Sequence, residues 1–324
     1  MINAAIFGLG KWGNILLDSV QGKSSKIRIA AVITRTVDKY EELAKEKGFS
    51  LVDNYHTVLE NPDIDAVILA TPHSLHEEHV KKAAAAGKHV FVEKPFTLTK
   101  SSAERAVQAC IENKVVLAVG FNRRFLPAFI EMKKMIASDK IGTILHIESQ
   151  FSGPSAYRRD PRSWRATRSE NPGGGMTARG IHTLDLMIHL CGEVNTLSSM
   201  SGRRATSGEV DDTTAMLLQF KNGSTGYLST IMATGNFWRI HVFGSKGWIE
   251  MKGMQSLTVS DLDGIVDSVQ FDDLDTEKAE LESFAESISS GNPFVVTPQE
   301  AIHGIAVLEA IEESAQSGLR VSVR

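Results

Sequence analysis

Short apolar runs alternate with helical patterns over the first 120 residues. Most of the runs are continuous rather than alternating, as expected of strands that are buried on both faces. They lie at 4–7, 27–33, 50–52, 65–70, 89–92 and 115–119. Segments with helical spacing separate them, at 14–20, 37–47, 74–86 and 100–113. Such an alternation predicts a parallel, doubly wound α/β sheet.

A different pattern begins near Gly120. One helix is expected at 126–138, and two more close the chain at 275–290 and 298–317. Between them lie strands bounded by turn signals, at 141–151, 197–202, 213–220, 224–231, 238–243 and 247–252. The sequence therefore predicts two domains, residues 1–120 and residues 121–324.

Composition narrows the class of protein without naming a chemistry. The 324 residues suffice for about two domains, and 42% hydrophobic with 23% charged residues is typical of a globular protein. No apolar stretch approaches the ~18–20 residues that span a bilayer, and the start lacks the basic region of a signal peptide. Two cysteines exclude a disulfide scaffold, and a net charge of −4 argues against a dedicated nucleic-acid binder. We expect a soluble, cytoplasmic protein.

Gly8-Leu9-Gly10-Lys11-Trp12-Gly13 follows the first strand directly and precedes a helix. This is the GxGxxG pattern in the context that a dinucleotide requires. The first glycine permits a tight turn, the second lets the backbone approach a pyrophosphate, and the third lets helix and strand pack closely. We therefore predict that this loop, with Lys11 and Trp12, binds the phosphates of a nicotinamide dinucleotide at the helix N-terminus.

The adenosine ribose is expected to be recognised after the second strand, where an NAD-specific site has Asp or Glu. This chain has Thr34 and Arg35 there instead. A guanidinium can stack on adenine and pair with a 2′-phosphate. We predict that NADP is preferred, with NAD as the other candidate. The plainer interpretation is that Arg35 is a solvated loop residue and that both cofactors bind.

Several short motifs then follow in a fixed order. They are the glycine loop, Ala70-Thr71-Pro72 with His76, Gly87-Lys88-His89-Val90, Glu93-Lys94-Pro95, Gly120-Phe121-Asn122-Arg123-Arg124-Phe125 and Gly180-Ile181-His182-Thr183-Leu184-Asp185. In this order the chain resembles the glucose–fructose oxidoreductase / inositol dehydrogenase (Gfo/Idh/MocA) family over nearly its whole length. The resemblance implies an N-terminal Rossmann domain and a C-terminal α/β domain with a large, mostly antiparallel sheet that often forms the oligomer interface. It also implies a nicotinamide-dependent oxidoreductase of sugars, inositols or related alcohols.

The resemblance further implies roles for individual residues. Lys94 would lie beside the nicotinamide and the substrate hydroxyl, and His182 would donate or accept the proton of that hydroxyl. An imidazole that titrates near neutral pH suits this role, and an ammonium can polarise a carbonyl. Further residues are expected at the cofactor: Thr71, Pro72, His73, His76, Glu93 and Asn122. The neighbouring His79 is expected at the surface.

The chain departs from the family pattern four residues before His182. Many members have an aspartate there, whereas this chain has Ala178, followed by Arg179. The substrate class or the proton path should then differ, or the protein is a non-catalytic, nucleotide-sensing regulator on the same scaffold. Asp185 would orient the His182 imidazole, or hold a backbone group or an arginine. We expect no metal site, because His189 suits a packed position better than a ligand position.

Arginines are concentrated between residues 158 and 168, interleaved with aromatic residues. The five are Arg158, Arg159, Arg162, Arg165 and Arg168. In relatives a loop that carries Trp-Arg approaches the active site. We expect an anionic substrate, such as a carboxylated or phosphorylated sugar, to be bound by Arg123, Tyr157, Trp164, Arg165, Arg179 and Asp185, together with Lys94 and His182. A solvated, salt-bridged loop and a nucleic-acid stripe are the other interpretations, and the net charge disfavours the second.

The combined prediction is a dehydrogenase or reductase that acts on CH–OH groups. A hydride would pass between the nicotinamide and a carbon of a sugar, polyol or related hydroxy or keto compound. His182 would handle the proton, and Lys94 would stabilise the alkoxide. We expect a small-molecule substrate, neither nucleic acid nor membrane as a partner, and, by analogy with the family, a homodimer or homotetramer.

Overall fold

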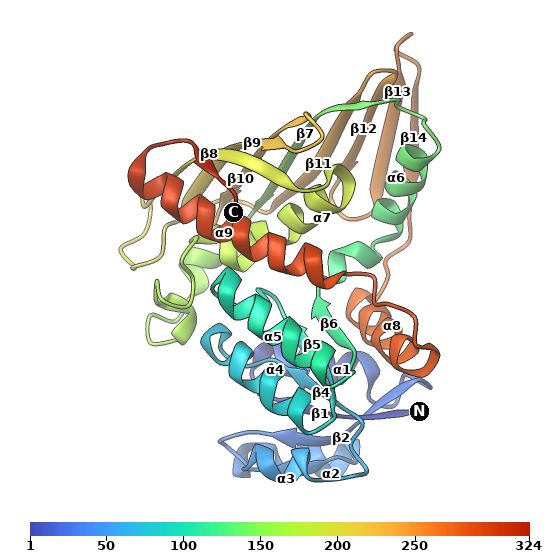
Figure 1. The fold of residues 1–324 in the computed structure, drawn as a ribbon, viewed down its shortest axis with the longest axis vertical. Coiled ribbons are helices and arrows are strands. Elements are labelled where there is room, and N and C mark those ends of the chain that lie inside the picture. The colour runs from blue at the N-terminus through green and yellow to red at the C-terminus, as the bar shows by residue number, and fades with distance from the viewer. The chain divides into compact units, whose positions relative to one another are not determined.

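Figure 1 shows the computed structural model, which describes residues 1–324. The chain forms two compact units: Met1–Asn122 with Asp275–Ala301, and Arg123–Leu274 with Ile302–Arg324. The expected boundary at residue 120 lies close to the first crossing between units. The contiguous division into 1–120 and 121–324 differs from the structure, however, because a helix near the C-terminus returns to the first unit. There the ring of Phe284 packs against that of Phe91, with 5.8 Å between centroids.

The first unit contains a six-stranded sheet whose neighbouring strands are all parallel. Its order is β3-β2-β1-β4-β5-β6 (Figure 1), the arrangement of a doubly wound dinucleotide-binding fold. The strands are β1 (Ile2–Phe7), β2 (Ile27–Ile33), β3 (Ser50–Val52), β4 (Ala66–Leu69), β5 (His89–Glu93) and β6 (Leu117–Gly120). The predicted parallel sheet is thus confirmed. Continuous apolar runs form these strands because both faces are buried.

Six α-helices accompany this sheet: α1 (Lys11–Val20), α2 (Glu41–Lys47), α3 (Tyr55–Leu59), α4 (His76–Ala85), α5 (Lys100–Glu112) and α8 (Thr276–Ser290). Helix α4 packs against α5, and α1 packs against α8. A capping box formed by Thr99 and Ser102 begins α5. The short α3 lies in a segment for which no element was predicted.

The second unit contains a nine-stranded sheet in the order β14-β13-β12-β11-β7-β10-β9-β8-β15. Only β7 and β10 are parallel neighbours, and the other pairs are antiparallel. The strands are β7 (Ile144–Ser152), β8 (Val194–Gly202), β9 (Thr213–Phe220), β10 (Thr225–Ile231), β11 (Phe237–Gly244), β12 (Gly247–Lys252), β13 (Ser256–Asp261), β14 (Val266–Gln270) and β15 (Val321–Ser322). The mostly antiparallel sheet implied by the family resemblance is confirmed.

Helices α6 (Pro127–Ala137), α7 (Ile181–Cys191) and α9 (Pro298–Ser317) accompany the second sheet (Figure 1). Helix α7 packs on β7, and α6 packs on β12 and β13. The hydroxyl of Ser199 on β8 donates to the carbonyl of Ile311 on α9 at 2.6 Å. Because strand side chains alternate between faces, the adjacent Met200 lies on the opposite face, where it is 78% exposed. No helix in either unit has both the length and the apolar character that a membrane span needs.

Candidate active site

The glycine loop has the shape that a pyrophosphate requires. Gly8 has φ +98°, and a Cβ there would lie 2.8 Å from the carbonyl oxygen of Ala70. A Cβ on Gly13 would lie 2.0 Å from the carbonyl oxygen of Gly8. A Cβ on Gly10, in contrast, would meet nothing within 4 Å. The first and third glycines are therefore needed for the turn and for packing, and the second faces open space.

Two side chains hold this loop in place. Asn14 Nδ2 donates to the carbonyl oxygens of Leu9 at 3.1 Å and Gly10 at 2.8 Å. The hydroxyl of Tyr40 donates to the Leu9 carbonyl at 2.6 Å. Helix α1 begins at this point with no side-chain cap and no acidic residue in its first turn. Its free amide groups therefore suit an anion, and the site fits a dinucleotide. No local pattern predicted the contact of Tyr40, which reaches the loop from a distant position in the chain.

The segment after β2 carries the residues expected at the adenosine ribose. Thr34 is buried, and its hydroxyl accepts from the backbone amide of Thr36 at 3.3 Å. Arg35 is exposed and forms no ion pair. Its guanidinium is thus available to a ligand.

Glu93 ends β5 at the carboxyl edge of the first sheet, and Lys94 follows it directly. Glu93 is 6% exposed, and its Oε2 accepts from the backbone amide of Lys94 at 3.3 Å. Burial raises the pKa of Glu93 to about 7, although the Lys94 charge and the Trp12 indole act in the opposite direction. A Cβ on Gly120 would lie 3.0 Å from Glu93 Oε1, so the neighbouring strand end leaves little room. Lys94 itself is half-buried.

His76 connects two turns at the carboxyl edge of the first sheet. Its imidazole is fully buried. Nδ1 lies 3.0 Å from the carbonyl oxygen of Pro95, and Nε2 lies 3.1 Å from that of Thr71. Both ring nitrogens therefore face backbone carbonyls, and the ring joins the turn after β4 to the turn that follows Lys94. These contacts hold the two turns together, and the cofactor contact expected of His76 stays a prediction.

The expectation for His79 is wrong. Its ring is half-buried beside Phe7, at 5.8 Å between ring centroids, and Tyr55, at 5.9 Å. Its Nδ1 lies 3.3 Å from the Thr71 hydroxyl. Burial, followed by the charge of His76, lowers the pKa of His79 to about 4. The ring is therefore neutral at physiological pH.

The remaining residues expected at the cofactor lie shortly after the ends of β4 and β6. Thr71 and Pro72 are half-buried, and His73 is buried. Asn122, which is 1% exposed, donates from Nδ2 to Glu277 Oε1 at 2.8 Å. This bond connects the end of the first sheet to α8. No sequence pattern indicated that contact. The Asn122 Nδ2 is therefore used in holding α8, whereas its buried Oδ1 has no hydrogen-bond partner.

In the second unit, His182 lies in the first turn of α7 and is 5% exposed. A single turn of π-helix, Met176–Gly180, precedes it. No sequence pattern predicted this turn, and such turns are common at functional sites. Phe151 on β7 lies beside the His182 ring, with 6.1 Å between centroids. The π-turn carries Arg179, whose guanidinium lies 5.1 Å from the centroid of the Phe151 ring.

Asp185 is buried and paired with an arginine of the same unit, and its predicted substrate contact stays a prediction. Both of its carboxylate oxygens accept hydrogen bonds from Arg124. Arg124 Nη1 also donates to Nδ1 of His189 at 2.9 Å. Of the roles considered for Asp185, holding an arginine is the one found. No group of three His, Cys, Asp or Glu side chains suited to a metal ion occurs.

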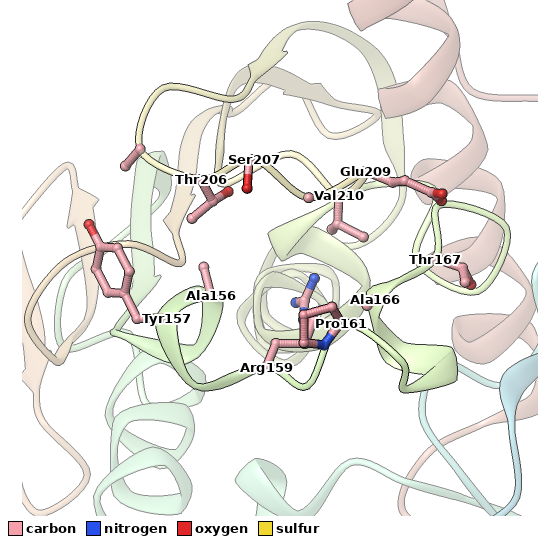
Figure 2. A pocket seen from close by; sticks show the side chains of 12 residues that line it. Ala156, Tyr157, Arg159, Pro161, Ala166, Thr167, Thr206, Ser207, Glu209 and Val210 are labelled. Carbon is pink, nitrogen blue, oxygen red and sulfur yellow. The ribbon is translucent and has the colours of Figure 1, made fainter.

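The arginine-rich loop lines a cavity of about 560 Å³ (Figure 2). Arg159 and Tyr157 come from one side of it, and Thr206, Ser207 and Glu209 come from a second loop. The Asp212 carboxylate holds that second loop by accepting from backbone amides of residues 204–206.

Neither Lys94 nor His182 lines this cavity. Trp164 and Arg165 stack on each other, with 4.1 Å between the guanidinium carbon and the ring. Tyr157 is 62% exposed, and Arg123 is half-buried. The predicted wall of Tyr157, Trp164 and Arg165 beside the substrate therefore stays a prediction.

Comparison with known proteins adds independent information. Residues 2–121 match the NAD-binding Rossmann-fold model of the GFO_IDH_MocA oxidoreductase family, and residues 129–250 match the C-terminal domain of that family. The scyllo-inositol 2-dehydrogenase (NAD(+)) of Bacillus subtilis (strain 168) is 28% identical over 337 residues, 99% of this chain and 96% of that protein.

Two solved structures are similar over the full length. A putative NADPH-dependent oxidoreductase from Desulfitobacterium hafniense DCB-2 has a TM-score of 0.92 at 26% identity and covers 99% of this chain and 97% of its own. An aldose–aldose oxidoreductase from Caulobacter crescentus has a TM-score of 0.90 at 26% identity and covers 99% of both chains. With both family domains matched in order, this chain belongs to the Gfo/Idh/MocA family of oxidoreductases with an NAD(P)-binding Rossmann fold.

Proposed function

We propose that the protein transfers a hydride between a nicotinamide dinucleotide and the CH–OH carbon of a sugar, inositol or related polyol. The observation that carries this proposal is the open space over Gly10 at the uncapped start of α1, in a sheet whose β5 ends at Glu93, directly before Lys94. Two of the similar proteins named above are an inositol dehydrogenase and an aldose–aldose oxidoreductase. Their substrates share secondary alcohols on a ring or an open chain.

Four groups of this chain would hold the cofactor. The glycine loop would hold the pyrophosphate, and Thr34 with Arg35 would hold the adenosine ribose. Thr71 and Pro72 would line the nicotinamide ribose, and Glu93 would lie near the nicotinamide ring. When bound, the nicotinamide supplies the acceptor or donor of the hydride at the reacting carbon.

Lys94 and His182 would act on the substrate oxygen. In the direction of oxidation, His182 takes the hydroxyl proton while the hydride leaves the carbon. The Lys94 ammonium donates to the same oxygen and stabilises its developing negative charge. In the direction of reduction, His182 returns the proton to the alkoxide. Retention of both groups favours an enzyme over a nucleotide-sensing regulator, even though Ala178 lacks a carboxylate.

NADP is proposed as the preferred cofactor. The exposed Arg35 forms no ion pair within the protein, and no Asp or Glu stands at the end of β2 to accept from a ribose 2′-hydroxyl. The planar guanidinium fork matches a 2′-phosphate. One similar structure is of a putative NADPH-dependent enzyme, whereas the Bacillus relative uses NAD(+).

We propose that copies of the protein associate through the exposed face of the second sheet. Leu217 on β9 lies opposite Tyr227 on β10 and is 62% exposed. Met200, on the neighbouring strand β8, lies on the same face. Exposed apolar side chains that adjoin across three strands are typical of an association surface. Light scattering after gel filtration should give a dimer or tetramer, and Leu217→Lys should shift it towards the monomer.

A turnover screen tests the proposed reaction. The protein is incubated with NAD⁺, NADP⁺, NADH or NADPH and a panel of inositols, aldoses, keto-sugars and sugar acids, and absorbance at the reduced-nicotinamide band is recorded. Cofactor-dependent turnover of at least one CH–OH or keto compound is expected. Tight cofactor binding without any turnover would instead support the regulatory alternative.

A further inference from the structure

The guanidinium of Arg179 lies beside Gly153, in a space that any larger residue there would fill. Its Nη1 donates to the carbonyl oxygen of Ser152 at 3.2 Å. A Cβ on Gly153 would lie 2.5 Å from the same Nη1 and 2.9 Å from the guanidinium carbon. The face of Phe151 covers the guanidinium, at 5.1 Å from the ring centroid. A glycine, a carbonyl and an aromatic ring thus fix this half-buried cation.

The charges that act on Arg179 are positive. It forms no ion pair, and its one hydrogen bond leaves most of its five N–H donors available. Burial, and after it the charges of Arg123 and Arg158, lower the pKa of the Arg179 guanidinium. Arg158 likewise forms no ion pair and is exposed. Other arginines of the loop differ, since Arg162 pairs with Asp160 and Arg168 with Asp211.

Arg179 and His182, the proposed catalytic histidine, pack against the same aromatic ring. The Phe151 ring that covers its guanidinium also lies beside the His182 ring. At the preceding position, Ala178 supplies no carboxylate that would neutralise it. Ser155, two residues beyond Gly153, has a buried hydroxyl with no hydrogen-bond partner. A fixed cation therefore shares the Phe151 ring with His182, and the segment that receives this cation also carries an unused hydroxyl.

We propose that Arg179 binds a carboxylate of the substrate, so that the protein acts on a sugar acid or another carboxylate-bearing polyol. This inference rests on the proposed function, which it makes more specific. A carboxylate is preferred over a phosphate ester because one guanidinium fork matches two carboxylate oxygens and one negative charge. A phosphate ester, with nearly two charges and three oxygens, would need more than this one fixed cation.

The test compares matched acids and neutral sugars: D-glucuronate with D-glucose, D-galacturonate with D-galactose, and D-gluconate with D-sorbitol. D-Glucose 6-phosphate is included as the phosphate probe. Two readouts are recorded for the full-length protein with cofactor, namely kcat and KM, and the Kd of each compound by calorimetry. The variants are Arg179→Gln, Arg179→Lys and Gly153→Ala, with Arg162→Gln as the matched control on an arginine that is already paired and exposed.

At least one sugar acid should have a higher kcat/KM or a higher affinity than its matched neutral sugar. Arg179→Gln should reduce that preference about 10- to 100-fold, as expected for a charge-assisted bond. The loss should lie mainly in KM, and it should exceed any loss on the neutral partner. Arg179→Lys should retain part of the preference because it keeps the charge but not the fork. Gly153→Ala should act like Arg179→Gln because its methyl displaces the guanidinium, and Arg162→Gln should behave as wild type.

Each other outcome identifies the claim that fails. Turnover of neutral sugars with no acid preferred overturns the inference and leaves the proposed reaction standing. Arg179-dependent binding of an acid without any turnover supports the inference and overturns the proposed reaction. An Arg179-dependent preference for glucose 6-phosphate over every acid overturns the assignment of a carboxylate. Equal losses on acid and neutral sugars in Arg179→Gln, or no binding of any acid, also overturn it.

Discussion

Arg124 and Asp185 form a buried, two-pronged ion pair, with Nε donating to Oδ2 at 2.8 Å and Nη2 donating to Oδ1 at 2.7 Å. Their side chains are 0% and 5% exposed. The pair joins the segment just after β6 to the middle of α7. Because His182 lies one turn earlier on α7, this pair positions the helix that carries it.

Asp185→Ala should lower the free energy of unfolding by about 3–5 kcal/mol, because it leaves the Arg124 charge buried without its partner. Urea unfolding followed by circular dichroism measures the change. Glu42→Ala, which removes an exposed i,i+3 pair with Lys45, serves as the control and should have no measurable effect. Equal stabilities of the Asp185 variant and the control would show that the pair contributes nothing.

Stability should depend on pH through Glu93. Its pKa is about 7 in the folded protein and 4.5 in the unfolded chain. The folded state therefore binds the proton more tightly. The contribution of this proton to the free energy of unfolding is full below about pH 4.5 and is lost as the pH rises through 7. Each pKa unit corresponds to about 1.4 kcal/mol.

Glu93→Gln removes this titration. The free energy of unfolding of the cofactor-free wild type should fall relative to the variant between pH 5 and pH 8 (roughly the window that linkage predicts). Urea titrations at several pH values measure the difference. Parallel stability profiles of the two proteins would contradict the assignment.

Arg35→Asp should weaken NADPH binding about 10- to 100-fold, because it replaces a charge-assisted contact with repulsion. NADH affinity should stay the same or improve, since the aspartate can accept from the ribose hydroxyls. Quenching of tryptophan fluorescence by each cofactor gives the two Kd values. An unchanged ratio of these values would exclude Arg35 from recognition of the phosphate.

Much of the fold followed from local patterns. The strands at Ile27–Ile33 and Thr213–Phe220 have the predicted bounds, because the first is buried on both faces and the second alternates between faces. Strand β14 was missed because all its residues are exposed and give no apolar signal. The return of α8 to the first unit was also missed, since it depends on a contact between Phe284 and Phe91 that no local pattern encodes.

The candidate site was predictable in part. The GxGxxG spacing indicated the glycine loop, and the family resemblance indicated Lys94 and His182, whose catalytic roles stay predictions. The positioning residues were not predictable, because their partners are distant in the chain. The Tyr40 hydroxyl contacts the glycine loop, and the His76 ring contacts the turn after Lys94. The π-turn that holds Arg179 likewise has no known signature in the residue types of 176–180.

Stopped-flow measurement of hydride transfer in Lys94→Met tests the central claim most directly. With the best substrate of the panel and saturating cofactor, the rate should fall about 10²- to 10⁴-fold, because the developing alkoxide loses its cationic donor. The Kd of the cofactor should remain close to that of wild type, which separates chemistry from binding. A variant that binds cofactor normally and transfers hydride at the wild-type rate would contradict the account.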